Sequence, residues 1–329
     1  MLPGIYRKRV KAGFRYVNAA GRPITDPKTL ARIKALVIPP AWTCVWIAPD
    51  AKSDLQCTGY DARGRKQYRY HTAWREARDK KKYQQLLKFG NAFPQIRQQV
   101  LRDLRKRGLP REKVMATVLA LLERTLIRVG NEEYAHQNGS YGLTTLRDQH
   151  VTIEKCRLSF SFDGKGGKSH FISLNNCMLA AIVKNCRAVP GKKLFQYVDS
   201  QGKARTVTST DVNRYLKEVS GSNFTAKDYR TWGGTMNCLR ELAALDMPRS
   251  QTEAKRSFAA AVRKVAERLG NTPAICRKCY IHPAVFADYL SNSRQLSRAF
   301  KAIQAEGGSE SVTEKSLIVY LRALRRQHS

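Results

Sequence analysis

The spacing of hydrophobic residues along the chain changes near residue 78. Before that point, short apolar runs alternate with turn sequences such as "DARG" at 61–64, which is typical of strands. Beyond it, apolar residues recur at the spacing of amphipathic helices. The pattern therefore predicts an α+β protein, with a small β-rich domain over residues 1–78 and a larger, mainly α-helical domain over residues 79–329.

The first domain is expected to contain short strands and one helix. The strand signals cover residues 13–24, 42–47 and 66–71. Asp26 and Pro27 suit the cap and first position of a helix, because Asp accepts a backbone hydrogen bond there and Pro lacks a donor. The charged segment 74–83, "WREARDKKKY", is expected to be either a solvated helix face or a basic linker that lies against phosphates.

The second domain begins with a clear helical stripe. Apolar residues over 114–126 predict a helix that stops at Gly130, with Arg128 at the edge of the stripe. The period then changes, because apolar and polar residues alternate within 157–174 around the turn sequence "DGKGGK". This change predicts a β-hairpin with Lys165 at its glycine-rich tip.

Three further helices are expected toward the end of the chain. Thr225 with Asp228 three residues later resembles a capping arrangement, which places Lys227 and Arg230 on one helical face. A second apolar stripe covers residues 258–269.

The sequence also predicts where these later helices end and begin. Gly270 closes the helix over 258–269, and Thr272 with Pro273 starts another one at once. Tyr280 then lies about two turns into this last helix, close to its end.

Charge points to a polyanionic partner. The chain has 60 Lys and Arg against 26 Asp and Glu, a formal net charge of +34, and the basic residues recur along its whole length. There is no long apolar span, signal-peptide pattern or lipidation motif, so nucleic acid is favoured over a membrane surface. The eight cysteines are mostly isolated in apolar segments, which predicts reduced thiols in the cytoplasm.

Cys276 and Cys279 form the one Cys-x-x-Cys pair. A structural zinc site needs four ligands, and no second pair is present at compatible spacing, so no metal site is expected. A redox dithiol gains some support from Arg277 and Lys278, which would lower the thiol pKa, but the strand that usually precedes such a motif is missing. The pair is interpreted as small packing residues beside Tyr280.

Six stretches carry a resemblance to a known family. They are "GRKQYRYH", "LIRVGNEEYA", "YGLTTLRDQHV", "FDGKGGKSH", "KDYRTWGGT" and "LGNTPAICRKCYIHP". In their residues, order and spacing they resemble the type IB DNA topoisomerases, specifically the compact branch shared by poxviruses and many bacteria. The resemblance covers both domains and implies the catalytic fold that these enzymes share with tyrosine recombinases.

The resemblance also implies a catalytic set. By position, Tyr280 matches the nucleophile, Arg128 and Arg230 match the two active-site arginines, and Lys165 matches the hairpin lysine. Asn271 occupies a position where some members have histidine, and its amide would add a neutral hydrogen bond there. Guanidinium groups fit phosphate oxygens, and a lysine of lowered pKa is suited to protonating the leaving oxygen.

The activity implied is relaxation of supercoiled duplex DNA. One strand is cut through a 3′-phosphotyrosyl intermediate, rotates and is resealed, without ATP, metal or another cofactor. The protein is expected to act as a monomer that clamps the duplex, in the bacterial nucleoid. DNA contacts are expected from Arg65, Lys66, Gln67, Tyr68, Tyr70 and Lys227.

Two alternatives compete with this interpretation. A site-specific tyrosine recombinase would typically have histidine three residues before the second arginine, where this chain has Lys227. A noncatalytic architectural DNA-binding protein would account for the charge but not for the spaced Arg, Lys, Arg, Asn and Tyr residues.

Overall fold

The computed structural model describes residues 3–11, 13–245 and 247–327. The chain divides into two compact units, Met1–Gln84 and Gln85–Ser329. The first contains a β-sheet and the second is mainly helical, as the hydrophobic pattern predicts. No helix in the described ranges has the length and apolar character needed to cross a membrane.

Helix α2 (Thr72–Leu104) runs through the division between the units. The segment 74–83 is therefore helical, as the helix-face alternative predicted, and it belongs to the helix that connects the two units. The physical reason is composition, since residues 72–89 contain neither Gly nor Pro and are rich in Ala, Glu, Lys, Arg and Gln, which favour helix. The predicted boundary at residue 78 falls inside this helix.

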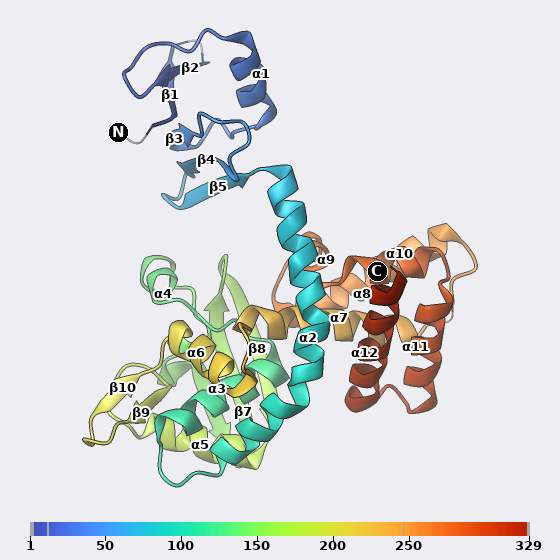
Figure 1. The fold of residues 1–329 in the computed structure, drawn as a ribbon. Helices are drawn as coiled ribbons and strands as arrows, with labels where there is room; N and C mark the ends of the chain where they lie inside the picture. Colours follow the sequence, from blue (N-terminus) through green and yellow to red (C-terminus); the bar gives the residue numbers. More distant parts are fainter. Residues whose placement is uncertain (1–2, 12, 246, 328–329) are drawn as a thin grey trace. The chain divides into compact units, whose positions relative to one another are not determined.

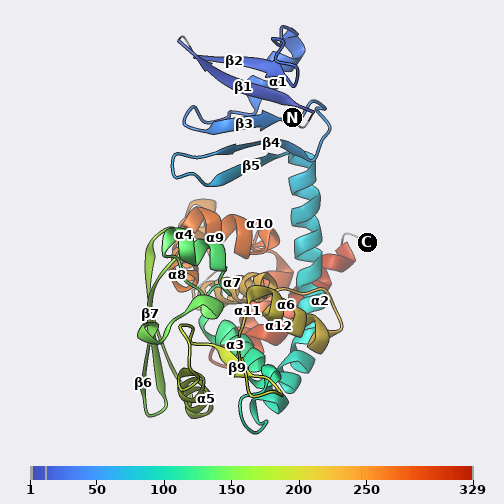
Figure 2. The same cartoon turned by 90° about the vertical axis from the view of Figure 1, so that its left-hand side faces the viewer.

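The described part of the first unit forms an antiparallel sheet with the strand order β2-β1-β3-β4-β5 (Figure 2). The strands are Ile5–Val10, Gly13–Asn18, Thr43–Ile47, Leu55–Tyr60 and Lys66–Tyr70. Helix α1 (Pro27–Ala35) is capped by Asp26, which accepts a hydrogen bond from Thr29 N at 2.9 Å, as predicted. The small core consists of Ile5, Ile33, Val45, Ile47 and Cys57.

The second unit surrounds a buried central helix, α7 (Ala226–Ala243), as Figure 1 shows. The other helices after α2 are α3 (Arg111–Thr125), α4 (Glu132–Asn138), α5 (Cys177–Arg187), α6 (Ser209–Ser220), α8 (Gln251–Leu269), α9 (Pro273–Tyr280), α10 (Pro283–Leu290), α11 (Arg294–Ala305) and α12 (Glu310–Gln327). Short 3-10 turns cover Leu143–Thr145 and Asp148–His150. Helices α3, α8, α9, α11 and α12 contact α7 directly.

Helix α3 ends five residues before the predicted stop at Gly130. Its last residue is Thr125, and Leu126 adopts the left-handed conformation with φ 55°. Leu126 keeps its side chain buried against Gly233 of α7, where a Cβ would lie 2.6 Å from the leucine. Arg128 therefore lies beyond α3 in a nonhelical segment, and its predicted place on the helical stripe is wrong.

The predicted hairpin is present. Strands β6 (Val151–Glu154), β7 (Arg157–Gly164) and β8 (Lys168–Asn175) form one antiparallel sheet, and β9 (Gln196–Val198) pairs with β10 (Ala204–Thr206) in another. Gly164 pairs with Lys168, which leaves Lys165, Gly166 and Gly167 as the loop at the tip. The two loop glycines have φ values of 81° and 71°, a region that glycine enters without strain.

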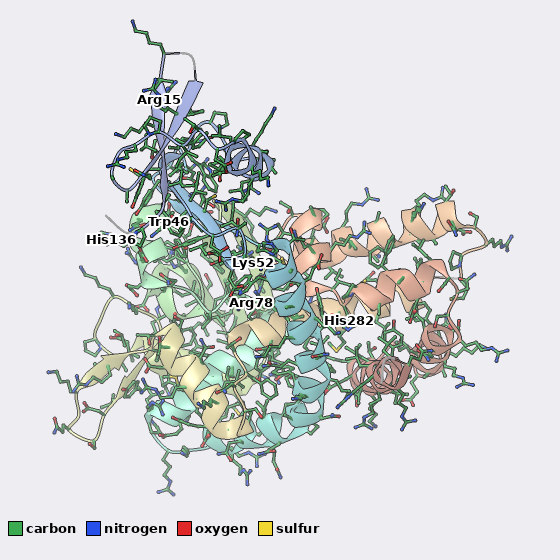
Figure 3. All side chains as sticks on the ribbon, turned by 45° about the horizontal axis from the view of Figure 1, so that its top comes forward. Arg15, Trp46, Lys52, Arg78, His136 and His282 are labelled. Atoms are coloured by element: carbon green, nitrogen blue, oxygen red, sulfur yellow. A yellow bond between two sulfur atoms is a disulfide. The ribbon has the colours of Figure 1, made fainter. Side chains whose placement is uncertain are left out.

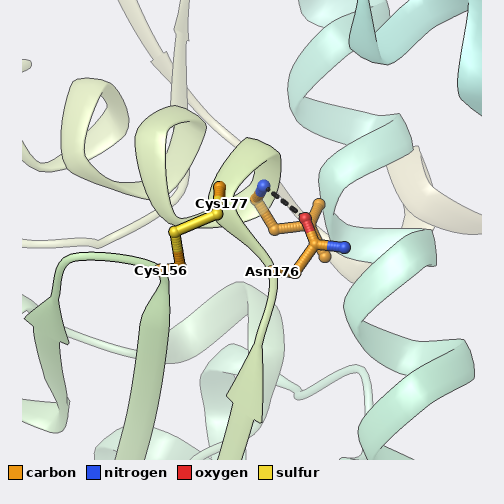
Figure 4. Close-up of a disulfide and its surroundings, with 4 residues drawn as sticks. Cys156, Asn176 and Cys177 are labelled. Carbon is orange, nitrogen blue, oxygen red and sulfur yellow. Dashed lines mark hydrogen bonds between the residues drawn. A yellow bond between two sulfur atoms is a disulfide. The ribbon is translucent and has the colours of Figure 1, made fainter.

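A disulfide joins Cys156 to Cys177 at the end of the hairpin opposite Lys165 (Figure 4). The prediction that all cysteines are reduced is therefore wrong for this pair, while the six other cysteines form no disulfide. The two cysteines are 21 residues apart in sequence, so their spacing alone did not indicate that they are close in the fold. The strand register brings them together, because Arg157 pairs with Asn175 and the backbone N–H of Asn176 donates to the carbonyl of Cys156.

Candidate active site

Arg230 lies at the base of the candidate site, on the buried side of α7. Its side chain is 3% exposed. One terminal nitrogen donates to the carbonyl of Leu126, where α3 ends, and the other donates to the carbonyl of Leu269, the last residue of α8, at 2.8 Å. Carbonyls at helix C-termini lack intrahelical partners and carry partial negative charge. The guanidinium of Arg230 thus connects the C-terminal ends of α3 and α8 to helix α7.

The same guanidinium faces the predicted nucleophile. Its central carbon lies 5.0 Å from the centre of the Tyr280 ring. Burial lowers the pKa of Arg230 to about 10, with Tyr280 acting to raise it and Arg128 to lower it. Since this value is well above 7, Arg230 is cationic at neutral pH and places a positive charge beneath the tyrosine.

Arg128 is half-buried in the segment that follows α3. It donates to the carbonyl of Gly270 at 3.3 and 3.4 Å and to the side-chain oxygen of Asn271. Its own carbonyl accepts from Leu143 N at 2.9 Å, so its backbone is fixed as well. Burial lowers the pKa of Arg128, while the charge and hydrogen bonding of Tyr280 raise it.

Asn271 occupies the turn between α8 and α9 and is 8% exposed. Its side-chain oxygen accepts from Arg128, and its amide nitrogen lies 3.5 Å from the carbonyl of Leu269. Its backbone carbonyl accepts from Nζ of Lys168 at 2.9 Å. In this geometry the amide orients Arg128 rather than standing apart as an independent donor.

Tyr280 is the last residue of α9 and is half-buried. Its carbonyl accepts from Oγ1 of Thr235 at 3.3 Å, and the same hydroxyl oxygen accepts from the backbone N–H of His282 at 3.1 Å. Gly234 lies so close that a Cβ there would be 2.6 Å from the carbonyl oxygen of Tyr280. Helix α7 therefore positions the backbone of the predicted nucleophile.

Sequence reasoning did not single out Gly234 or Thr235. A signal was present, since two adjacent glycines, Gly233 and Gly234, lie in the middle of a helix, where glycine is unfavourable. Each permits a close contact, with Leu126 and Tyr280 respectively.

Lys165 is not brought into contact with the other predicted catalytic residues. It is exposed at the hairpin tip, and no hydrogen bond or ion pair is found for it within the described residues. The lysine of the hairpin that does contact the site is Lys168, through Asn271. The structure thus gathers Arg128, Arg230, Asn271 and Tyr280, with Lys165 on the adjoining loop.

The two cysteines beside Tyr280 have the character of packing residues. Cys276 is fully buried, and neither cysteine takes part in a disulfide. Burial raises the pKa of Cys276 to about 12, although the positive charge of Arg230 lowers it, so the group is a thiol at neutral pH. Within the described ranges, no three His, Cys, Asp or Glu side chains are placed to hold a metal ion.

The residues predicted to contact DNA from the first unit lie on and before β5. Arg65 pairs with Asp61 at 2.7 Å, and Gln67 donates to the same carboxylate at 2.9 Å. Hydrogen bonding from Arg65 is the main reason that the pKa of Asp61 falls to about 2. Asp61 thereby organises the end of this strand, a role that sequence reasoning missed.

The aromatic residues of β5 form a short stack. The Tyr68 and Tyr70 rings are 6.2 Å apart, and Tyr70 stacks on Trp74 at 4.2 Å. Tyr68 is 46% exposed, and Lys66 lies 5.9 Å from its ring centre. Basic side chains are exposed elsewhere on this unit, including Arg15, Lys52 and Arg78 (Figure 3). In the second unit, Lys227 is exposed on the first turn of α7.

Comparison with known proteins adds two family matches. Residues 71–307 match the catalytic core of eukaryotic DNA topoisomerase I, and residues 13–61 match the N-terminal domain of bacterial DNA topoisomerase IB. DNA topoisomerase 1B of Acanthamoeba polyphaga mimivirus is 32% identical over 299 residues, which cover 89% of each chain.

More distant relatives agree with these matches. DNA topoisomerase 1B of Vaccinia virus (strain Copenhagen) is 22% identical over 235 residues, covering 70% of this chain and 71% of the relative. DNA topoisomerase 1 of Schizosaccharomyces pombe is 26% identical over 181 residues, which cover 54% of this chain and 21% of the relative. The core match spans most of the chain and includes every residue of the buried site described above, so this chain belongs to the type IB DNA topoisomerase family.

Proposed function

We propose that this topoisomerase relaxes supercoiled DNA by cutting one strand with Tyr280, allowing the strand to rotate and then resealing it. Family membership supports the overall activity of breaking and rejoining DNA. The observation that carries the residue assignment is the position of Arg230, which is buried, cationic and 5.0 Å from the Tyr280 ring. Arg128 provides a second cation beside the same tyrosine.

The reaction is a transesterification. The phenolic oxygen of Tyr280 loses its proton and attacks phosphorus, the bond from phosphorus to the 5′ oxygen breaks, and the 5′ oxygen takes up a proton. The products are a 3′-phosphotyrosyl ester and a free 5′ hydroxyl. Resealing reverses these steps, and because the ester conserves the bond energy, the reaction needs no ATP.

The arginines stabilise the charge that develops during this reaction. The pentacoordinate transition state carries extra negative charge on its nonbridging oxygens, and donors fixed in advance around it lower the barrier. Arg128 is held by Gly270 and Asn271, and Arg230 is held by two helix ends. Because their positions are fixed before DNA binds, little reorganisation is needed during the reaction.

Lys165 is proposed to protonate the leaving 5′ oxygen. A poor leaving group requires a proton as its bond breaks, and an ammonium group can donate one. The hairpin that carries Lys165 is anchored to the site, because Lys168 of the same hairpin donates to Asn271. An exposed lysine on a glycine-containing loop can then reach a bound strand.

We propose that the protein binds duplex DNA as a monomeric clamp, with one unit on each side of the duplex. The net charge of +34 supports strong phosphate binding, and the exposed Tyr68 and Lys66 support contacts from the first unit. The second unit is proposed to have the catalytic fold shared with tyrosine recombinases. The bacterial N-terminal family match supports action at a bacterial nucleoid in the cytoplasm.

The test uses supercoiled plasmid in EDTA without ATP. Wild-type protein and a Cys276→Ala, Cys279→Ser double variant should relax the plasmid, whereas Tyr280→Phe should bind it without relaxing it or forming a covalent adduct. Tyr280→Phe retains the ring that lies over Arg230, so it isolates the hydroxyl group. Relaxation by Tyr280→Phe, or dependence on the cysteines, would overturn the assignment.

A further inference from the structure

The imidazole of His170 fills a space between the hairpin tip and the end of α8. His170 is on β8, directly opposite Phe162 on β7, and it is 9% exposed. The two rings stack with their centres 5.0 Å apart and an interplanar angle of 8°. This stacking fixes the ring plane, so the imidazole edge points in a defined direction.

That edge contacts two glycines from separate parts of the chain. A Cβ at Gly164 would lie 2.5 Å from Nε2 of His170, and a Cβ at Gly270 would overlap Cε1 of the same ring. Gly164 immediately precedes Lys165, and Gly270 immediately precedes Asn271. The histidine therefore touches the residues that lead into the proposed acid and into the turn that orients Arg128.

A second contact holds the same tip. Nζ of Lys168 donates to the carbonyl of Asn271 at 2.9 Å, and Lys168 pairs with Gly164 across the hairpin. Gly167 N donates to the carbonyl of Gly164 at 3.0 Å and closes the loop. The exposed Lys165 is thus on a loop whose two ends are both held against the end of α8.

The charges around His170 favour a neutral ring. Burial lowers its pKa most, Arg128, Arg230 and Lys168 lower it further, and only Asp163 acts to raise it. A protonated imidazole would add a further positive charge beside three existing ones. The neutral ring can therefore act as a spacer at physiological pH.

We propose that His170 is a positioning residue that sets the location of Lys165 relative to the cleaved phosphate by separating Gly164 from Gly270. The inference rests on the proposed function of Lys165 as the acid that protonates the 5′ oxygen. A displacement of about 1 Å at a catalytic group can slow a reaction by about 100-fold. Loss of the spacer should therefore impair the protonation step selectively.

The experiment compares two leaving groups in single-turnover cleavage by the full chain. The DNA is a short duplex with a cleavage site first mapped using wild-type protein, made with either oxygen or sulfur as the bridging 5′ atom. A thiolate leaves without a proton, so sulfur bypasses the acid. His170→Ala should slow cleavage of the oxygen substrate by about 10- to 100-fold, yet cleave the sulfur substrate within about threefold of wild type.

Three further variants define the mechanism. Lys165→Ala should show the same selective loss, and adding His170→Ala to it should cause little further loss. Gly164→Ala places a methyl group against His170 without requiring a left-handed backbone, so it should reproduce the defect from the other side of the contact. Ile172→Ala removes a partly buried side chain from the same strand, further from the tip, and should cleave both substrates normally.

The outcomes separate the two proposals. If sulfur rescues Lys165→Ala but neither His170→Ala nor Gly164→Ala, the positioning role is overturned and the acid assignment stands. If sulfur fails to rescue Lys165→Ala, the acid assignment is overturned, and the positioning role with it. If sulfur rescues Lys165→Ala, His170→Ala and Gly164→Ala, and Ile172→Ala cleaves both substrates normally, the acid role of Lys165 and the positioning role of His170 are both supported. Should His170→Ala fail to fold, Gly164→Ala provides the same comparison.

Discussion

At the level of single residues, Arg230 supports the fold as well as the site. Its guanidinium satisfies carbonyls at the ends of α3 and α8, and it also faces Tyr280. Lysine has one nitrogen in place of the guanidinium fork and cannot reproduce both contacts. Replacement of Arg230 should therefore produce two effects that can be measured separately.

For Arg230→Lys, we expect the free energy of unfolding to fall by about 1–3 kcal/mol, because a buried carbonyl loses its donor. Cleavage should slow by at least about 100-fold, because a fixed donor to the transition state is lost. Chemical denaturation and single-turnover cleavage measure the two effects. Lys227→Ala, at an exposed position on the same helix, is the control and should change stability by less than about 0.5 kcal/mol. Equal stability of Arg230→Lys and wild type would contradict the structural role.

Gly234 gives a second prediction at this scale. In Gly234→Ala, the added methyl group would lie 2.6 Å from the carbonyl oxygen of Tyr280 and 3.0 Å from its Cβ, so the tyrosine must shift. We expect cleavage to slow by about 100-fold while DNA affinity stays close to that of wild type. Single-turnover cleavage rates and equilibrium DNA binding check these two results. An unchanged cleavage rate would show that the close contact between Gly234 and Tyr280 does not determine the position of the tyrosine.

The limits of sequence reasoning are also visible at single residues. The motifs indicated Arg128, Arg230, Asn271 and Tyr280, which the fold does gather. His170 ends the stretch "FDGKGGKSH", but no role was predicted for it, because its contacts are with Gly164 and Gly270, six and one hundred positions away in the chain. Such contacts depend on tertiary structure, which local spacing does not specify.

At the level of secondary structure, the sequence predicted helices and strands better than their ends. Gly270 and the Thr272 cap are found as predicted, because capping is decided by neighbouring residues. The end of α3 was missed because Leu126, not a glycine, adopts the left-handed conformation. Its packing against Gly233 compensates for that conformation, and this contact lies more than one hundred residues away in the chain.

The disulfide at the base of the hairpin leads to a prediction about stability. A Cys156→Ser, Cys177→Ser double variant should be less stable by about 3 kcal/mol, because the bridge spans 21 residues and restricts the unfolded chain. For a domain of this size, the melting temperature should fall by about 6–12 °C.

Thermal unfolding with and without reductant checks this prediction. Relaxation activity below the melting transition should persist, because the bridge is at the opposite end of the hairpin from Lys165. Identical melting of the wild-type protein in both conditions would show that the bridge does not contribute.

At the level of the whole molecule, the charge of +34 should govern DNA binding. A protein that neutralises six or more phosphates releases the counterions bound to them, so affinity should fall by roughly a thousandfold or more between about 50 and 200 mM salt. Equilibrium binding to one duplex across this range measures the slope. A flat response would argue against a clamp built on phosphate contacts.

Stability should also depend on pH through two buried histidines. Burial lowers the pKa of both His150 and His170. The charge of Arg147 lowers the pKa of His150 further, and the charges of Arg128, Arg230 and Lys168 do the same for His170. Asp163 acts to raise the pKa of each histidine. The unfolded chain, with histidine pKa values of about 6.5, then binds protons more readily than the folded protein. The stability that the two neutral histidines contribute is fully present above about pH 6.5, the pKa of histidine in the unfolded chain. It is lost as the pH falls through their lowered pKa values in the folded protein.

Thermal melting between pH 7.5 and 5 tests the sign of this effect. The melting temperature should fall toward pH 5, and His170→Phe should reduce the slope, because it retains a ring but removes one proton-binding group. A slope unchanged by this substitution would exclude His170 as a contributor.

The position of Arg230 at two helix ends also has an evolutionary consequence. A descendant that no longer cut DNA would be released from selection on the hydroxyl group of Tyr280, since the hydrogen bond from Thr235 goes to the backbone carbonyl of that residue. Although it would lose the use of Arg230 in catalysis, it would still require this residue to hold α3 and α8 in place. In lineages where catalysis has decayed, the arginine should therefore outlast the tyrosine.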